Sequence, residues 1–549
     1  MNGSPILAVN NTILWLKVIL TAATIIFLYF RYRRGRERTS EGSSRKPSFL
    51  AKALLVVAVV FSFGVYHNLG NFRGGGFVHV ADMFNYYLNT KYFNEVGYFD
   101  LYDAVLVADT EQGNQLAGLP FYTDLRTYQN VNRERALQGA DRIRSRFSSE
   151  RWRAFKEDVA FFKTATGMPR STGGLMFLLM DHGYNGSPVT TLVLGTIANI
   201  VPLTKLQLLA YFDVFLMLAM SGLVFHTFGL EMGAVFSVYF CVNVLNAADS
   251  ISGCFLRYDW LFYIVVAVCL LERKRYASSA FFLTLSAMLR VFPAALLYGM
   301  VVIIFKRAKR TGAVDKKSQR FILAAGVTGA ALFLLPAVYT GTVLQPWSDF
   351  SKKIELHDRG VYVNHLGFRG IALFESDHLS LERFYNIYAS TRTPDIVRHW
   401  QNVKEAELKE KRPIIAFVSL IVLICLSAII WKRESETEAV LWPLVFVYTA
   451  SYPAHYYYGF LCLFILLFFK RPNSLDALVP LCLLLSLNIA ALLGDYGGAS
   501  PIVFYTLINI YLFACFSFIL VFELYRNVLG KERRESLQHW IRGTLRPMT

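Results

Sequence analysis

Polar residues that suit transfer chemistry lie beside long apolar segments of this chain, in five clusters. A carboxylate in such a place can take the proton of an attacking hydroxyl group, and an arginine can pair with phosphate oxygens through two parallel hydrogen bonds. Charged residues within or beside membrane segments are costly and are usually functional or paired. The clusters are 82–87 (DMFNYY), 249–259 (DSISGCFLRYD), Arg290, 352–369 and 452–458 (YPAHYYY). They indicate chemistry at a membrane surface.

Asp82 is the candidate general base. It comes shortly after a predicted membrane helix, and Tyr86 and Tyr87 follow it closely and offer a surface on which a sugar ring can stack. Two alternatives stay open. Asp82 could cap a helix, because Asp is among the preferred N-cap residues, or it could be an ordinary surface carboxylate.

Arg257 and Arg290 are the candidates for holding a phosphate, because the planar guanidinium group matches phosphate geometry. Both occur beside or within apolar segments. Asp259 is included among the candidate binding residues. The alternative for Arg257 is a structural ion pair with Asp259 or Asp249.

His365 and Arg369 are candidate binding residues in the second long connection. A histidine titrates near neutral pH and can donate a hydrogen bond to an oxyanion. The neighbouring Lys352 and Lys353 are expected on a solvated loop face. His455 is either a further binding residue or part of the aromatic belt at a membrane interface, where tyrosines are enriched.

The composition is that of an integral membrane protein, with 54% hydrophobic and 17% charged residues, against about 25% charged in soluble domains. Lys and Arg resist translocation, so short basic connections stay in the cytoplasm. Two long connections are nearly neutral and are expected outside: 66–188 holds 13 basic and 13 acidic residues, and 341–412 holds 11 and 10. We attribute the net charge of +17 to this topology and to contact with anionic membrane lipids, not to nucleic acid.

The apolar segments predict an all-α integral membrane protein with about 11–13 transmembrane helices. Two segments are unusual. Residues 189–201 are short for a crossing and are predicted to be re-entrant or interfacial; residues 277–305 are predicted to form a broken hairpin, because Pro293 interrupts them and removes a backbone donor. The other predicted helices are 12–30, 50–66, 206–228, 232–248, 258–271, 321–340, 413–431, 439–451, 459–469, 477–493 and 501–524.

Six parts of the chain follow from this pattern. They are N-terminal helices with a basic connection (1–66), a first extracytoplasmic loop (67–187), a central bundle (188–340), a second extracytoplasmic loop (341–412), C-terminal helices (413–525) and a basic cytoplasmic tail (526–549). Both long loops are expected to carry amphipathic helices near the membrane. The clearest candidate, 133–163, is expected to lie along the membrane or pack on the bundle.

The seven cysteines lie almost all inside apolar segments, without the spacing of a metal site or a disulfide framework. We therefore expect no cofactor, although the sequence leaves dependence on a divalent metal open.

Several segments resemble bacterial membrane proteins of the C-type glycosyltransferase superfamily, which use polyprenyl-phosphate sugars. The first and third are the most specific, and the last is a weaker match. They are 81–104 (ADMFNYYLNTKYFNEVGYFDLYDA), 181–188 (DHGYNGSP), 255–276 (FLRYDWLFYIVVAVCLLERKRY), 289–293 (LRVFP) and 364–369 (NHLGFR).

This resemblance implies a multi-pass enzyme of the bacterial inner membrane that works at its outer face in cell-envelope glycan assembly. Such enzymes move a hexose or pentose from a polyprenyl-phosphate donor to a glycan, lipid or protein acceptor, with an acidic residue at the start of the first outer loop as the base. Here that residue is Asp82. The acidic pair separated by one residue that several relatives carry is missing, which leaves the base and any metal dependence open.

Two other functions fit the same sequence. The protein could transport or flip a lipid-linked glycan, or serve as a non-catalytic membrane protein in envelope assembly. Internal inverted repeats would favour transport, and none is evident. The sequence does not identify the sugar, the acceptor, the stereochemistry or the oligomeric state.

Overall fold

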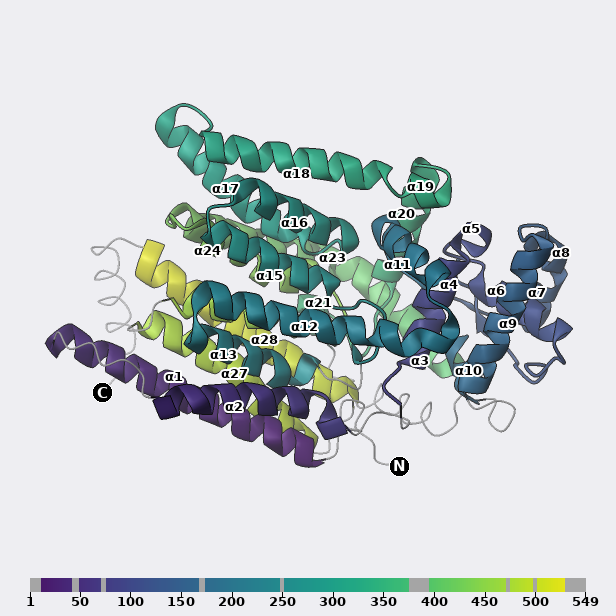
Figure 1. The fold of residues 1–549 in the computed structure, drawn as a ribbon, viewed down its shortest axis with the longest axis horizontal. Coiled ribbons are helices and arrows are strands. Elements are labelled where there is room, and N and C mark those ends of the chain that lie inside the picture. Colours follow the sequence, from purple (N-terminus) through teal and green to yellow (C-terminus); the bar gives the residue numbers. More distant parts are fainter. Residues whose placement is uncertain are drawn as a thin grey trace.

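A computed structural model of the chain is almost entirely helical (Figure 1). It describes residues 11–41, 49–70, 76–166, 173–246, 251–374, 394–470, 474–496 and 501–528. Among these residues, seven helical segments are long and apolar enough to cross a membrane: Thr12–Gly35, Phe49–Tyr66, Leu203–Phe228, Lys316–Thr340, Asn402–Trp431, Leu475–Gly494 and Val503–Arg526. The prediction of an all-α, multi-pass membrane protein is confirmed.

The bundle contains the long helices and several shorter ones packed between them (Figure 1). Its long helices are α1 (Asn11–Glu41), α2 (Phe49–Tyr66), α12 (Leu206–Phe228), α17 (Ala294–Thr311), α18 (Lys316–Leu334), α23 (Pro394–Trp431), α27 (Leu475–Tyr496) and α28 (Pro501–Glu523). Its shorter helices are α11 (Pro188–Ile200), α13 (Leu230–Val242), α15 (Asp259–Glu272), α16 (Tyr276–Leu289), α24 (Glu436–Leu441), α25 (Leu444–Ala450) and α26 (Leu463–Phe468), with a 3₁₀ helix at His455–Cys462.

The break predicted within 277–305 separates α16 from α17 at residues 290–293. Leu289 ends α16, Arg290 adopts an extended backbone, and Pro293 stands directly before α17. Proline has no backbone N–H and its ring clashes with the preceding turn of a helix, so α16 cannot continue through Pro293. The break places the Arg290 side chain at the edge of the cavity described below.

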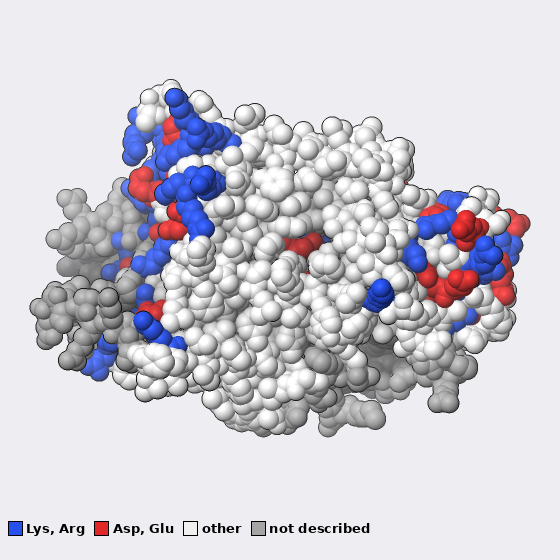
Figure 2. Space-filling model, viewed as in Figure 1, with Lys and Arg blue, Asp and Glu red and all other residues white. Residues whose placement is uncertain are grey.

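Charge separates the two ends of the bundle (Figure 2). Lys and Arg gather at the end where α17 and α18 meet, and a broad band follows whose surface carries only one acidic patch near its middle and one basic group toward the other end. At that other end, over α5 to α9, basic and acidic groups are mixed. A band with little charge between two charged ends is the pattern expected of a surface in contact with lipid.

The first loop folds into a compact domain beside the bundle (Figure 1). Its elements are α3 (Val80–Met83), a π-helical turn (Phe84–Leu88), α4 (Asn89–Lys91), α5 (Phe93–Val96), α6 (Leu101–Glu111), β1 (Tyr122–Thr123), β2 (Asn130–Val131), α7 (Arg133–Gln138), α8 (Ala140–Arg144), α9 (Ser149–Ala165) and α10 (Gly173–Leu178). The segment 133–163 therefore forms three helices, where we predicted one. Gly139 ends α7, and Ser148 caps α9 by accepting from the backbone N–H of Arg151.

α19 (Ala337–Thr340) stands directly before the second loop, which contributes α20 (Leu344–Arg359), α21 (Phe368–Ala372) and the first part of α23. Residues 375–393 of this loop lie outside the described part of the chain.

Two apolar cores meet at one short segment, residues 251–258. Ile251, Cys254 and Tyr258 belong to the core of the bundle, whereas Phe255 and Leu256 belong to the core of the first-loop domain. The segment therefore joins the two cores, and the candidate site lies at this junction.

Candidate functional site

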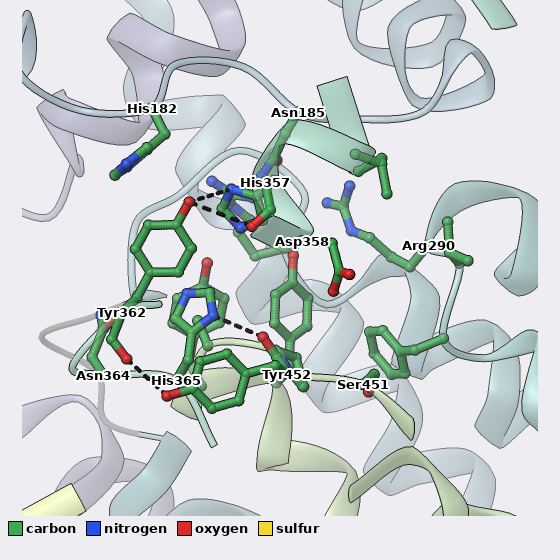
Figure 3. A pocket seen from close by; sticks show the side chains of 18 of the residues that line it. His182, Asn185, Arg290, His357, Asp358, Tyr362, Asn364, His365, Ser451 and Tyr452 are labelled. Carbon is green, nitrogen blue, oxygen red and sulfur yellow. Dashed lines mark hydrogen bonds between the residues drawn. The ribbon is translucent and has the colours of Figure 1, made fainter. Parts of the chain in front are cut away.

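A cavity of about 780 Å³ lies between the bundle and the first-loop domain. Its lining comes from α3 and the π-helical turn, the 181–187 and 251–257 segments, the break before α17, α20, and the 362–369 and 446–457 segments. Figure 3 shows His182, Tyr362, His365 and Tyr452 on one side and Arg290 on the other. All five polar clusters identified in the sequence contribute to this cavity.

Asp82 forms a buried ion pair with Arg257. One Asp82 oxygen, Oδ1, accepts from Arg257 Nε at 2.7 Å and also from Nη2. The other, Oδ2, accepts from the backbone N–H of Phe255 at 2.8 Å. Asp82 is not the N-cap of α3, because that place is taken by His79, whose side chain accepts from the Asp82 N–H. Asp82 is thus not a helix cap, and Arg257 pairs with Asp82 instead of Asp259. Asp249, the other partner considered for Arg257, lies outside the described residues.

A second carboxylate, Asp213, holds the backbone on the other side of Arg257. It accepts from the N–H of Arg257 at 2.9 Å and of Tyr258 at 3.0 Å. Between the two carboxylates Leu256 has a φ of 53°, a left-handed conformation that is costly for a bulky residue. Sequence reasoning missed Asp213, although a lone acidic residue inside the apolar helix α12 was a usable signal.

Close backbone contact also fixes this segment. Gly253 has a φ of +76°, and a Cβ atom there would lie 1.7 Å from the carbonyl oxygen of Phe77. The Gly253 carbonyl accepts from the N–H of His79 at 3.0 Å. Because any other residue would collide with the backbone just before α3, this glycine allows Asp82 and Arg257 to meet.

Two buried guanidinium groups present hydrogen-bond donors without partners. Arg257 Nη1, Arg290 Nε and Arg290 Nη2 are buried and find no acceptor among the described residues. Arg290 also has no ion pair within the described part of the chain, although it is only 7% exposed. Unpaired buried donors of this kind cost several kcal/mol unless a ligand satisfies them. The arrangement is suited to an anion.

Tyr86 links the phosphate candidates to the rest of the site. The guanidinium of Arg257 lies over its ring, 3.5 Å from the centroid, and its hydroxyl donates to Asn185 Oδ1 at 2.5 Å. The residue before it, Asn85, donates to Asp181 Oδ2 at 3.0 Å. Asn85 and Tyr86 belong to the π-helical turn, a local feature frequent at functional sites.

A ring of aromatic side chains forms the wall near the second loop. Tyr362 lies 4.6 Å from His365 and 4.8 Å from His182 between ring centroids, and it stacks on His357 at 5.0 Å. Burial, with the charges of His182 and Lys353, lowers the pKa of His357 to about 3. His357 is therefore uncharged at neutral pH.

His365 accepts a proton poorly and is held in one orientation. Its Nδ1 lies 2.7 Å from the carbonyl oxygen of Tyr452, which can only accept, so Nδ1 carries the hydrogen. Burial lowers the pKa of His365 well below its usual value, and Nε2 of the neutral ring is then an acceptor. This geometry suits a substrate hydroxyl better than the oxyanion contact that we predicted.

Arg369 lines the cavity but is already paired. It donates to the Asp358 carbonyl at 2.7 Å and to its carboxylate at 2.6 Å, which joins α21 to the end of α20. This pairing makes Arg369 a weaker phosphate candidate than Arg290.

Three predicted site residues do not line the cavity. The Tyr87 hydroxyl donates to the Val201 carbonyl at 2.7 Å, away from the cavity. Asp259 is buried and accepts from the N–H of Trp260 at 2.8 Å. His455 is buried beside the Asn364 carbonyl, with Nδ1 3.2 Å from it, and is therefore not on a lipid-facing belt.

Among the described residues, no three His, Cys, Asp or Glu side chains are placed so that they could bind a metal ion together. The described cysteines are all free and none is fully exposed.

Lys353 lies behind the cavity wall, and its burial makes a stability prediction. Its ammonium group is fully buried over the Tyr128 ring, 4.7 Å from the centroid, and burial lowers its pKa from 10.5 to about 7. At pH values between about 7 and 10.5, Lys353 is protonated in the unfolded chain but not in the folded one. The free energy of unfolding therefore rises with pH over this range, by up to about 1.4 kcal/mol per pH unit. We expect Lys353→Met to remove this slope, measured as melting temperature against pH in detergent; parallel curves for both proteins would contradict it.

Compared with known proteins, the chain matches no family model, no curated protein and no solved structure. Fold and site therefore define its class: a multi-pass, all-α membrane protein with a polar cavity between its helix bundle and a folded loop domain.

Proposed function

We propose that the protein is a membrane glycosyltransferase that moves a sugar from a polyprenyl-phosphate donor to an acceptor in this cavity. The observation that carries the proposal is the pair of buried guanidinium groups, Arg257 and Arg290, with three donors lacking partners. The departing lipid phosphate needs such donors, because they stabilise the negative charge that develops on its oxygen.

An apolar wall adjoins these arginines and is suited to the lipid part of the donor. It includes Phe292 and Ala295 around the start of α17, and Phe446, Val447 and Ala450 from α25. Val291, which also lines the cavity, is 58% exposed. An anion site beside an exposed apolar edge favours a ligand with both a phosphate and a long apolar chain over a free sugar phosphate.

The resemblance of segments 81–104, 181–188, 255–276 and 289–293 to C-type glycosyltransferases supports the same function, since all four contribute residues to the cavity. We further propose that the mixed-charge end of the bundle faces the outside of a bacterial inner membrane, as the positions of the basic connections predict.

The proposal is tested with decaprenyl phosphate and decaprenol as probes for the purified protein in nanodiscs. We expect native mass spectrometry to show retention of the phosphate and at least tenfold weaker retention of the alcohol, since each charge-assisted hydrogen bond contributes about 1.5–3 kcal/mol. A panel of decaprenyl-phosphate pentoses and hexoses, incubated with membrane extract as a source of acceptor, should then release decaprenyl phosphate. Equal retention of the two probes, or no release from any donor, would overturn the proposal.

A further inference from the structure

Three carboxylates line the cavity: Asp82, Asp181 and Asp358. Asp358 is already paired with Arg369, and the other two differ in accessibility. The side chain of Asp82 is 3% exposed and both of its oxygens accept hydrogen bonds from the protein. The side chain of Asp181 is 54% exposed although it lines the cavity. A general base must come within hydrogen-bond reach of the proton that it takes, and Asp181 meets this condition more directly.

One oxygen of Asp181 accepts a hydrogen bond and the other faces His182. Oδ2 accepts from Asn85 Nδ2 at 3.0 Å. Oδ1 lies 3.6 Å from His182 Nδ1, beyond ordinary hydrogen-bond distance. Burial in the protein would raise the pKa of Asp181, but the close approach of His182 outweighs this effect and lowers the pKa. Asp181 is thus ionised at neutral pH.

The surroundings of Asp181 suit a polyhydroxylated acceptor. His182, the next residue, joins Tyr362, His357 and His365 in the aromatic wall. His365 offers a neutral acceptor nitrogen, and the rings offer apolar faces. A few directional polar groups among aromatic rings are typical of small-molecule sites.

Asp181 and the phosphate site are held by consecutive residues of one turn. Asn85 anchors Asp181, and Tyr86 supports the guanidinium of Arg257. This turn therefore fixes the positions of Asp181 and Arg257 relative to each other, and both residues line the cavity.

We infer that Asp181 is the general base and that it lies in an acceptor subsite for a sugar hydroxyl, walled by His182, His357, Tyr362 and His365. This inference rests on the proposed glycosyl transfer. In the reaction the acceptor O–H proton passes to Asp181, the acceptor oxygen bonds to the anomeric carbon, and the bond from that carbon to the phosphate oxygen breaks. Its electron pair leaves on decaprenyl phosphate or its natural counterpart, held by Arg257 and Arg290. Asp82 then positions Arg257.

The test compares Asp181→Asn with a matched control, Asp141→Asn. Asn keeps an oxygen that accepts from Asn85 but takes no proton, so turnover of the active decaprenyl-phosphate sugar should fall by about two to four orders of magnitude, with decaprenyl phosphate retention and melting temperature unchanged. The Asp141→Asn variant makes the same change of charge on the same domain. Because the Asp141 side chain is fully exposed, this variant should keep full turnover.

The outcomes separate this inference from the proposed function. Full turnover in Asp181→Asn, with an active wild type, would overturn the role of Asp181 and leave glycosyl transfer standing. A fall in turnover matched by lost decaprenyl phosphate retention would also overturn it, because a base is not required for donor binding. A wild type that releases no decaprenyl phosphate from any donor would overturn the proposed function itself.

Discussion

Replacing Arg290 by methionine is expected to weaken retention of decaprenyl phosphate while raising the melting temperature of the ligand-free protein. Its Nε and Nη2 are buried without partners, so in the absence of ligand this charge destabilises the fold. Methionine fills a similar volume and needs no hydrogen bonds. With phosphate bound, the same donors become charge-assisted hydrogen bonds of about 1.5–3 kcal/mol each, and their loss should weaken binding by at least about tenfold.

Arg307→Met is the matched control for this prediction. Arg307 is also buried, at 9% exposure, but it donates to Glu436 at 2.6 Å at the opposite, basic end of the bundle. Its replacement leaves a buried carboxylate with weaker pairing and should lower the melting temperature without changing phosphate retention. An Arg290→Met protein that is less stable and still retains decaprenyl phosphate would show that Arg290 is a structural residue.

An Arg290→Lys variant separates charge from geometry. An ammonium group keeps the charge but cannot make two parallel hydrogen bonds to a phosphate. We expect retention between that of the wild type and that of Arg290→Met. Retention equal to the wild type would mean that the site responds to charge alone.

The apolar parts of the long helices could be predicted closely because length and apolar composition determine them, whereas polar extensions were missed: α1 continues to Glu41 and α23 begins at Pro394. The segment 206–228 was predicted with the observed bounds of α12, and 501–524 differs from α28 by one residue. Short elements were harder. The predicted helix 439–451 is two helices, α24 and α25, with Pro443 directly before α25, because a proline within an apolar run interrupts the backbone hydrogen bonds locally.

The candidate site could be predicted as a set of residues but not as a set of pairs. The sequence indicated Asp82, Arg257 and Arg290 because charge beside apolar segments is costly. It did not show that Asp82 pairs with Arg257, 175 positions away, because only the fold brings the 76–83 and 251–258 segments together. For the same reason Asp181 was seen as part of a motif, and its accessibility compared with Asp82 emerged only from the structure.

Tyr87 and His455 were predicted to belong to the site, but neither lines the cavity. Each stands next to a residue that lines the cavity, Tyr86 and Tyr456 respectively. Successive residues of a helix point in directions about 100° apart, so a polar cluster in sequence includes side chains that point away from the site. Tyr87 and His455 are such residues, and each hydrogen-bonds or approaches a backbone carbonyl instead.

Asp82→Asn is expected to lower the free energy of unfolding by about 3–5 kcal/mol, the usual effect of removing one partner from a buried ion pair. Arg257 would keep its charge at 8% exposure without a carboxylate, and Leu256 would lose part of the support for its left-handed backbone. The measurement is thermal or denaturant unfolding in detergent, alongside turnover.

The double variant Asp82→Asn with Arg257→Met completes the cycle. Because it removes both charges, it should recover part of the stability lost in Asp82→Asn. If the two residues acted independently, the double variant would instead lose the sum of the two single losses. Asp82 was predicted from the sequence to be the general base, and the same variants decide between the two roles. A folded Asp82→Asn protein with wild-type stability and turnover reduced by about two to four orders of magnitude would restore that role to Asp82; a loss of stability relieved by the double variant assigns Asp82 to positioning Arg257.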